Sequence, residues 1–419
     1  MNQKATMNVI VPQIYMKSIG INTLSSLAFI FAMLIYAGFS APFPANPGVA
    51  EVLIAFLLVI FVTIPTSVIV IGGGFTLYKQ YFAMPVWLHL SFFLLLWWGV
   101  FNGGVVYAWG LNDVVRDVIP CIYLFVPLLL LPTINRSKMN WLYILPWLLS
   151  LMGVIMAVRF YYVVQISPFE IGKMYYFDNF LYLSYDPSVS FASVFLPIMA
   201  VHTWRSKSLI RWICSLLMLM GGVLALGSLM AVAQRAPLGL AAFSYFVYFL
   251  MISRKSIKKI MLLLALAIVI GAAAQHQIQS SYDLLMAKQE NFGLNGKTDE
   301  MMTVIKETSG SVYSLLFGMG WGGLFHDPAV NNIKVSYTHS AVTFFLLKGG
   351  IFGLTIFVSY LFWLLRNLLK SMNIQNLPYI LSCLVPLMIG LLFQVSYKTL
   401  SYGIILTLLC LLYQQRTSN

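Results

Sequence analysis

The chain has 419 residues, of which 60% are hydrophobic and 9% are charged. Soluble domains carry about 25% charged residues, so this composition excludes an ordinary soluble enzyme and predicts a polytopic membrane protein. The formal net charge of +13 does not indicate nucleic-acid binding, because the basic residues fall mostly in short loops between apolar runs.

The apolar runs predict an all-α protein, because each is long enough for a membrane-spanning helix of about 20 residues. About twelve spans are expected, and together they make residues 1–419 a single integral membrane domain. They lie at 19–39, 50–73, 83–107, 114–133, 140–165, 187–204, 208–231, 236–253, 257–275, 341–365, 377–394 and 397–414.

The basic residues predict the orientation of these spans. Short loops with several basic residues, such as 254–259, fall on the same side as the N-terminus, and the positive-inside rule makes that side cytoplasmic. Both termini are then cytoplasmic, and residues 276–340 form one large loop on the opposite, outer face. Within it, Met301–Ile305 and Val312–Phe317 have the pattern of short amphipathic helices lying on the membrane.

The end of the large loop holds the strongest candidate for a functional site. Gly318 and Gly320 belong to a glycine-rich turn, which lets the backbone approach a ligand closely. His339 precedes the helix predicted from residue 341, for which Ser336 or Thr338 is the expected cap. A helix N-terminus disfavours imidazolium, so His339 is expected to be neutral at pH 7 and able to accept a proton. A simple connection at the membrane surface would also fit these residues.

Several cations lie at the outer ends of predicted spans, where a charge is costly without a partner. Asp113 and Asp117 flank Arg116 and can neutralise it locally, whereas Arg235 has no acid near it in the sequence. For Arg159, snorkelling to the interface and a functional role explain the position of the charge equally well. Few acids accompany these cations, so their field suits a lipid phosphate or diphosphate. The set consists of Arg116, Arg159, Arg235, Lys348 and Lys398.

Four segments of the chain, in this order, resemble the bacterial O-antigen polymerase and O-antigen ligase group. These proteins are polytopic glycosyltransferases that use undecaprenyl-diphosphate-linked glycans. The segments are Tyr185–Ala192, Gln234–Gly239, Phe317–Gly322, and Thr338–Ser340 followed by Gly349–Gly353. Two positions depart from the family pattern. Ser340 stands where the family commonly has asparagine, and Lys297 is the nearest counterpart of a second loop arginine.

The resemblance implies an active site on the periplasmic face of the bacterial inner membrane. Arg235 would hold the diphosphate, with Arg116, Arg159 or Lys297 as helpers, and His339 would take the proton from the acceptor hydroxyl. Further residues are expected to contact diphosphate or glycan, and Trp321, Phe325 and Tyr313 are candidates for contact with sugar rings. The further diphosphate or glycan contacts are Gly318, Gly320, Tyr337, Lys348 and Lys398.

The expected partners are an undecaprenyl-diphosphate-linked oligosaccharide, membrane lipids and a chain-length regulator of the same pathway, with no nucleic acid. No cluster of carboxylates with metal spacing is visible in the outer loops, so neither a divalent metal nor another cofactor is expected. A polymerase of lipid-linked repeat units is favoured. An O-antigen ligase that transfers the glycan to lipid A-core remains open, as do a lipid-linked oligosaccharide flippase and a secondary transporter.

Overall fold

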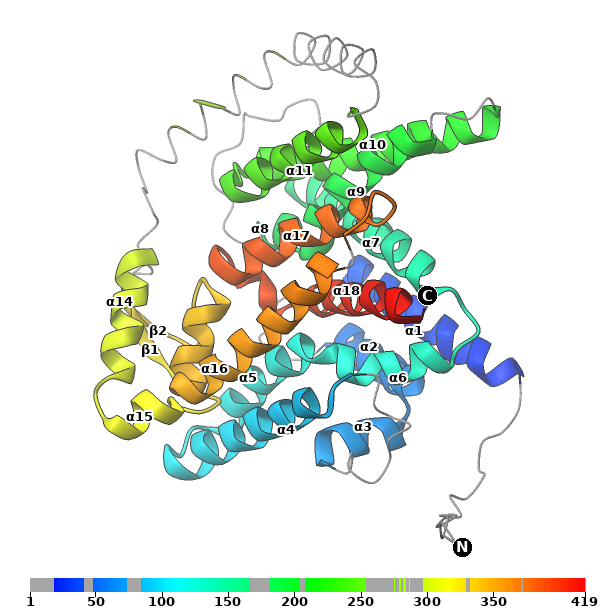
Figure 1. Ribbon diagram of the computed structural model, residues 1–419. Coiled ribbons are helices and arrows are strands. Elements are labelled where there is room, and N and C mark those ends of the chain that lie inside the picture. Colours follow the sequence, from blue (N-terminus) through cyan, green and yellow to red (C-terminus); the bar gives the residue numbers. More distant parts are fainter. Residues whose placement is uncertain are drawn as a thin grey trace, which may run out of the picture.

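The computed structural model describes most of the chain (Figure 1). The described ranges are 19–40, 48–73, 84–165, 181–203, 208–253, 297–328, 332–370 and 372–418, with single positions at 167, 275, 279, 282, 283 and 286. The ninth predicted span, 257–275, lies outside this part of the chain except for its last residue. The N-terminal segment 1–18, which bears on the predicted orientation, also lies outside it.

Helices make up nearly all of the described chain. Their bounds are α1 Ile19–Phe39, α2 Val49–Val62, α3 Ile64–Gly72, α4 Val86–Phe101 with a π-turn at Asn102–Val106, α5 Leu111–Leu124, α6 Val126–Arg136, α7 Trp141–Val164, α8 Leu181–Tyr185, α9 Pro187–Thr203, α10 Leu209–Ala231, α11 Arg235–Ser253, α14 Lys297–Thr308, α15 Val312–Phe317, α16 Ala341–Lys370, α17 Leu377–Leu392, a 3₁₀ turn at Val395–Lys398, and α18 Leu400–Ser418.

The apolar helices are consistent with a helical membrane protein, and the described residues support four to six membrane spans by length and composition, not the twelve predicted. Four are long and apolar enough to cross a bilayer: α4 with its π-turn, α7, α10 and α16. The pairs α2–α3 and α5–α6 are bent by 90° and 45°, and they bring the number to six if each pair crosses as one span. Both bends fall where a proline begins the second helix, because proline cannot continue the hydrogen bonding of the first. Five further apolar stretches are shorter, namely Thr23–Phe39 of α1, α9, Arg235–Met251 of α11, α17, and Leu400–Gln415 of α18.

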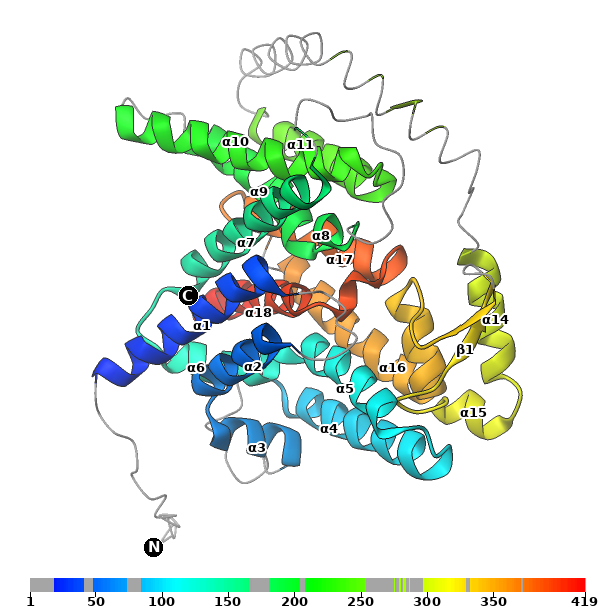
Figure 2. The ribbon, with the colours of Figure 1, turned by 180° about the vertical axis from the view of Figure 1, so that it is seen from behind.

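Helix α18 lies at the centre of the molecule (Figures 1 and 2). It packs against α5, α6, α7, α9, α16 and α17. Residues 401–412 are buried without interruption, as expected for a helix that is apolar on every side. Helices α10 and α11 lie together along one edge of the molecule and pack against α9.

The second half of the predicted outer loop forms a compact group beside α16 (Figure 2). Both predicted amphipathic helices are present, as α14 and α15, and Met301, Met302 and Val312 are exposed on them. The loop also departs from the all-α prediction. Strands β1 (Phe325–Asp327) and β2 (Ile333–Val335) pair antiparallel, with Phe325 opposite Val335.

The glycine turn, Gly318–Gly323, attaches this group to the membrane helices. Helix α16 is kinked at Gly350, whose φ of 60° is left-handed, and carbonyls next to the kink bind the turn. The Leu347 carbonyl accepts from the Met319 amide and the Lys348 carbonyl from the Gly320 amide, both at 2.9 Å. A Cβ at Gly320 would lie 2.2 Å from the Gly103 nitrogen. The close approach that glycine allows here is therefore between two parts of the backbone.

A buried ion pair holds the same region together. The Lys348 ammonium of α16 lies 2.5 Å from the Asp117 carboxylate of α5, and neither side chain is exposed. Asp117 also accepts from the Gly322 amide at 2.8 Å, and Lys348 donates to the Gly323 carbonyl. One carboxylate and one ammonium thus connect α5, α16 and the glycine turn.

We expect Lys348→Met to destabilise the protein, because Asp117 would stay buried without its cation. Breaking one side of a buried pair costs about 3–5 kcal/mol, whereas removing both charges costs far less. The double variant Lys348→Met/Asp117→Asn should therefore be more stable than Lys348→Met alone. Thermal unfolding in detergent measures both, with exposed Lys306→Met as the control. Equal or lower stability of the double variant would contradict coupling between the two residues.

Candidate functional site

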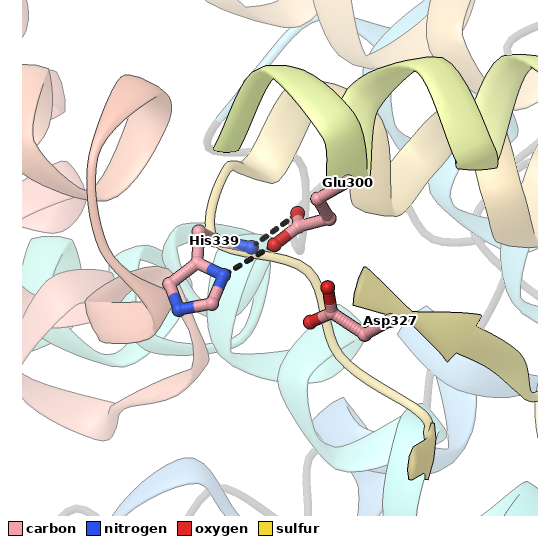
Figure 3. A group of neighbouring side chains, drawn as sticks. All are labelled: Glu300, Asp327 and His339. Atoms are coloured by element: carbon pink, nitrogen blue, oxygen red, sulfur yellow. Dashed lines mark hydrogen bonds and ion pairs between the residues drawn. The ribbon is translucent and has the colours of Figure 1, made fainter. Parts of the chain in front are cut away.

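His339 lies against a carboxylate that the sequence analysis did not single out. The backbone amide of His339 donates to Glu300 Oε1 at 2.8 Å, and ring atom Nδ1 contacts Glu300 Oε2 (Figure 3). The His339 side chain is 27% exposed and that of Glu300 is 3% exposed. The contact at Nδ1 leaves Nε2 for another group, as in histidines that are oriented by a carboxylate for proton transfer.

A small apolar cluster explains why Glu300 reaches this position. Glu300, Val304 and Thr308 are buried at intervals of four residues, so they share one face of α14. Val304 packs with Phe325 of β1 and Leu347 of α16. These contacts hold α14 between the hairpin and the kinked helix, and they place Glu300, one turn before Val304, beside His339.

The start of α16 differs in detail from the prediction. Ser340, and neither Ser336 nor Thr338, caps the helix, because its hydroxyl accepts from the Thr343 amide at 3.1 Å. Thr338 is buried and accepts the Tyr397 hydroxyl on its carbonyl at 3.1 Å. His339 therefore precedes the cap and lies between the N-terminus of α16 and the Glu300 carboxylate.

Asp327 is the third polar residue at this position. It alternates with His326 on β1, so Phe325 and Asp327 face inward while His326 is exposed. The Asp327 carboxylate points toward Glu300 and His339 (Figure 3), and ligand atoms of the three residues lie within 4.8 Å of one another. The outer loops show no carboxylates at metal-ligand spacing in the sequence, but the fold brings residues 300, 327 and 339, which are far apart in the chain, into a cluster with metal-ligand chemistry. The expectation that no metal binds stays a prediction.

Two of the predicted diphosphate-binding cations share one region next to Glu300. Burial lowers the pKa of Lys297, and the positive charge of Arg235 lowers it further, whereas Glu300 opposes the shift. Lys297 donates to the Phe393 carbonyl at 2.8 Å, and Gln394, the next residue, donates to Gln234 at 3.3 Å. The fold therefore brings Lys297 to Arg235, the residue with which the resemblance pairs it.

Lys398 is a buried cation beside Tyr337. Its ammonium lies 4.7 Å from the Phe344 ring centre and 5.5 Å from that of Tyr337. Within the described chain it has these ring contacts but no hydrogen bond or ion pair. Burial lowers the pKa of Lys398 to about 7, a shift that Asp117 opposes and Lys348 and Arg116 increase. The Tyr337 ring in turn lies 6.3 Å from the His339 ring.

The other predicted cations have partners within the protein. Arg116 pairs with Asp113 at 2.6 Å and lies 3.6 Å from Asp117, which confirms the local neutralisation expected from the sequence. Arg159 donates to the Ala37 carbonyl at 2.7 Å and to that of Ser40 at 3.3 Å. Lys348 belongs to the ion pair with Asp117. These contacts give the three cations structural roles.

The glycines and aromatic residues of the turn also have structural explanations. Gly318 and Gly320 have φ values of 71° and pack against α16 and the π-turn after α4. Trp321 and Phe325 are each 1% exposed, so the structure does not leave them available to sugar rings. Tyr313 is 37% exposed and donates to Asn102 at 2.9 Å.

Glu300 and Asp327 are functional candidates that were not predicted from the sequence. The chain has only 12 acidic residues, and these two fall within the segment already expected to hold the site. The small number of acidic residues could have drawn attention to these two. Nothing in the spacing of residues 300, 327 and 339, however, predicts that they meet.

No family model matches this chain, and no curated protein matches its sequence. The geometry of the site is therefore the basis for its interpretation.

We expect anion binding near Lys398 to weaken as the pH rises from 6 to 8.5. An anion prefers the ammonium form, and with a pKa of about 7 this form is lost over that range. Arginine stays charged throughout, so Lys398→Arg should reduce the pH dependence. Titration with a water-soluble prenyl diphosphate measures both, and Lys306→Arg is the exposed control. An unchanged pH dependence in Lys398→Arg would exclude Lys398 from anion binding.

Proposed function

We propose that the chain is an inner-membrane glycosyltransferase that polymerises lipid-linked repeat units of O-antigen or a related surface polysaccharide. It would transfer a glycan from undecaprenyl diphosphate to a sugar hydroxyl of the next lipid-linked repeat, at the periplasmic face. The twelve-span topology with cytoplasmic termini, inferred from hydropathy and charge, belongs to this proposal.

One observation carries the proposal. The imidazole of His339 contacts the buried carboxylate of Glu300, which acts electrostatically on Lys297, as does Arg235. The Tyr337 ring, 6.3 Å from that of His339, contacts the ammonium of Lys398. A proton acceptor in the same region as these cations suits a reaction in which a hydroxyl loses a proton and a diphosphate leaves with its negative charge.

The chemistry follows from these positions. The acceptor oxygen attacks the anomeric carbon, a new carbon–oxygen bond forms, and the bond from that carbon to the diphosphate oxygen breaks. Nε2 of His339 takes the hydroxyl proton, while the Glu300 carboxylate accepts from Nδ1 and stabilises the imidazolium that results. Arg235 and Lys297 hold the departing diphosphate, and arginine offers its oxygens a forked set of donors.

We expect His339→Gln to lose about 10²–10⁴-fold in turnover, because glutamine cannot accept the proton. Glu300→Gln should retain more activity, since it removes only the orienting carboxylate. The assay uses the purified protein in nanodiscs with a lipid-linked repeat. His326→Gln is the matched control, because this histidine lies on the exposed face of β1 in the same loop. Turnover near that of the wild type in His339→Gln would exclude the proposed proton transfer.

The cations should affect a different kinetic constant in the same assay. Lys297→Gln and Arg235→Lys are expected to weaken donor binding and so raise KM for the lipid diphosphate, whereas exposed Lys306→Gln should leave it unchanged. Donor binding that is identical in all three variants would contradict the assignment of Arg235 and Lys297 to the diphosphate.

Deletion of the gene distinguishes a polymerase from an O-antigen ligase. A single repeat unit on lipid A-core, seen by electrophoresis of surface polysaccharide, is the expected result for a polymerase. Long chains that remain on undecaprenyl diphosphate would instead identify a ligase, which uses lipid A-core as its acceptor.

A further inference from the structure

The group formed by Glu300, Asp327 and His339 has a second chemical property besides proton transfer. Each residue comes from a different element: α14, β1 and the segment before α16. Glu300 and Asp327 are 2% and 0% exposed, so water reaches neither carboxylate freely. One imidazole nitrogen and oxygens of both carboxylates lie within 4.8 Å of one another.

Burying two carboxylates side by side is costly unless positive charge lies between them. Elsewhere the chain is strongly basic, with a formal net charge of +13 and only 12 acidic residues. Two buried carboxylates beside an imidazole form a set of groups that a divalent cation neutralises and binds.

We propose that Glu300, Asp327 and His339 bind a divalent transition cation, with Zn²⁺ as the best fit. One imidazole and two carboxylates are ligands of borderline hardness, which Zn²⁺ accepts. Three protein ligands would leave a fourth position open, as in zinc sites that bind a water or a substrate.

The geometry of the cluster permits Zn²⁺ binding after small movements of the side chains. With zinc–nitrogen and zinc–oxygen distances of about 2.0–2.2 Å, the ligand atoms of a tetrahedral site lie roughly 3.3 Å apart. The three ligand atoms already lie within 4.8 Å of one another, so small rotations of the Glu300 and Asp327 side chains would close the site. The apolar packing of Val304 and Phe325 fixes the two backbones from which these side chains extend.

Cation binding and proton transfer by His339 exclude each other. A cation at Nδ1 would replace the contact of this nitrogen with Glu300 and leave the ring proton on Nε2. His339 could then donate a hydrogen bond through Nε2 but could not accept a proton there. Cation binding depends only on the three side chains and is independent of the transferase activity proposed above.

The test measures binding directly. Chelator-treated protein in detergent is dialysed against Zn²⁺, and bound zinc is counted by elemental analysis. A Cys214→Ser background removes the exposed thiol as a competing ligand. We expect the parent protein to bind one Zn²⁺ more than either Asp327→Asn or His339→Gln does. His326→Gln, which changes a histidine outside the cluster, should keep the full number.

Thermal unfolding distinguishes loss of zinc binding from misfolding of the variants. Zn²⁺ should raise the unfolding temperature of the parent protein and of His326→Gln, because a ligand that binds the native state stabilises it. It should not raise that of Asp327→Asn or His339→Gln, even where these variants unfold at the parent temperature without zinc. Equal zinc content and equal thermal shifts in all four proteins would show adventitious binding only and overturn the proposal.

If the site exists, Zn²⁺ should also inhibit glycan transfer by the parent protein, and Asp327→Asn should resist this inhibition. Zinc binding at the cluster without glycan transfer would support the metal site and contradict the proposed transferase activity. Glycan transfer with zinc binding that does not depend on Asp327 would support the transferase activity and contradict the metal site.

Discussion

The ion pair between Lys348 and Asp117 is the contact on which the geometry of the outer region depends. It lies where α5, the kinked α16 and the glycine turn meet, and neither charge reaches solvent. The same junction stabilises the kink in α16. Carbonyls of α16 just before Gly350 accept hydrogen bonds from the amides of the glycine turn, and these bonds compensate for the distortion of the helix. This junction and the packing of Val304 against Leu347 together fix α14, α15 and the hairpin relative to the membrane helices.

The cations of this protein divide into two groups according to what they contact. Arg116, Arg159 and Lys348 bind carboxylates or carbonyls of neighbouring helices and hold those helices together. Burial lowers the pKa of both Lys297, which is partly buried and interacts with Arg235, and Lys398, which is buried against the Phe344 and Tyr337 rings. A charged group whose burial costs desolvation free energy is typical of functional sites, where a ligand of opposite charge offsets that cost. This division favours the second group as the anion-binding one.

The cluster at His339 combines two chemistries that are usually separate. A carboxylate against one ring nitrogen suits a general base, and a second carboxylate nearby completes a set of metal ligands. The same apolar packing of Val304, Phe325 and Leu347 produces both, because it sets the distance between α14, β1 and α16. Whether a proton or a cation occupies the cluster would then decide whether His339 can act as a base.

The sequence by itself determined the membrane character, most helix positions and the amphipathic helices of the outer loop. These follow from local patterns: apolar runs, charge asymmetry and residues that favour turns or caps. It also predicted the partners of Arg116, because they lie within one helical turn. The tertiary structure alone decided the hairpin, the pairing of Lys348 with Asp117, and the meeting of Glu300, Asp327 and His339. The three cluster residues approach one another only because α14 and the hairpin fold back onto a kinked helix, and no periodicity in the chain encodes that long-range packing.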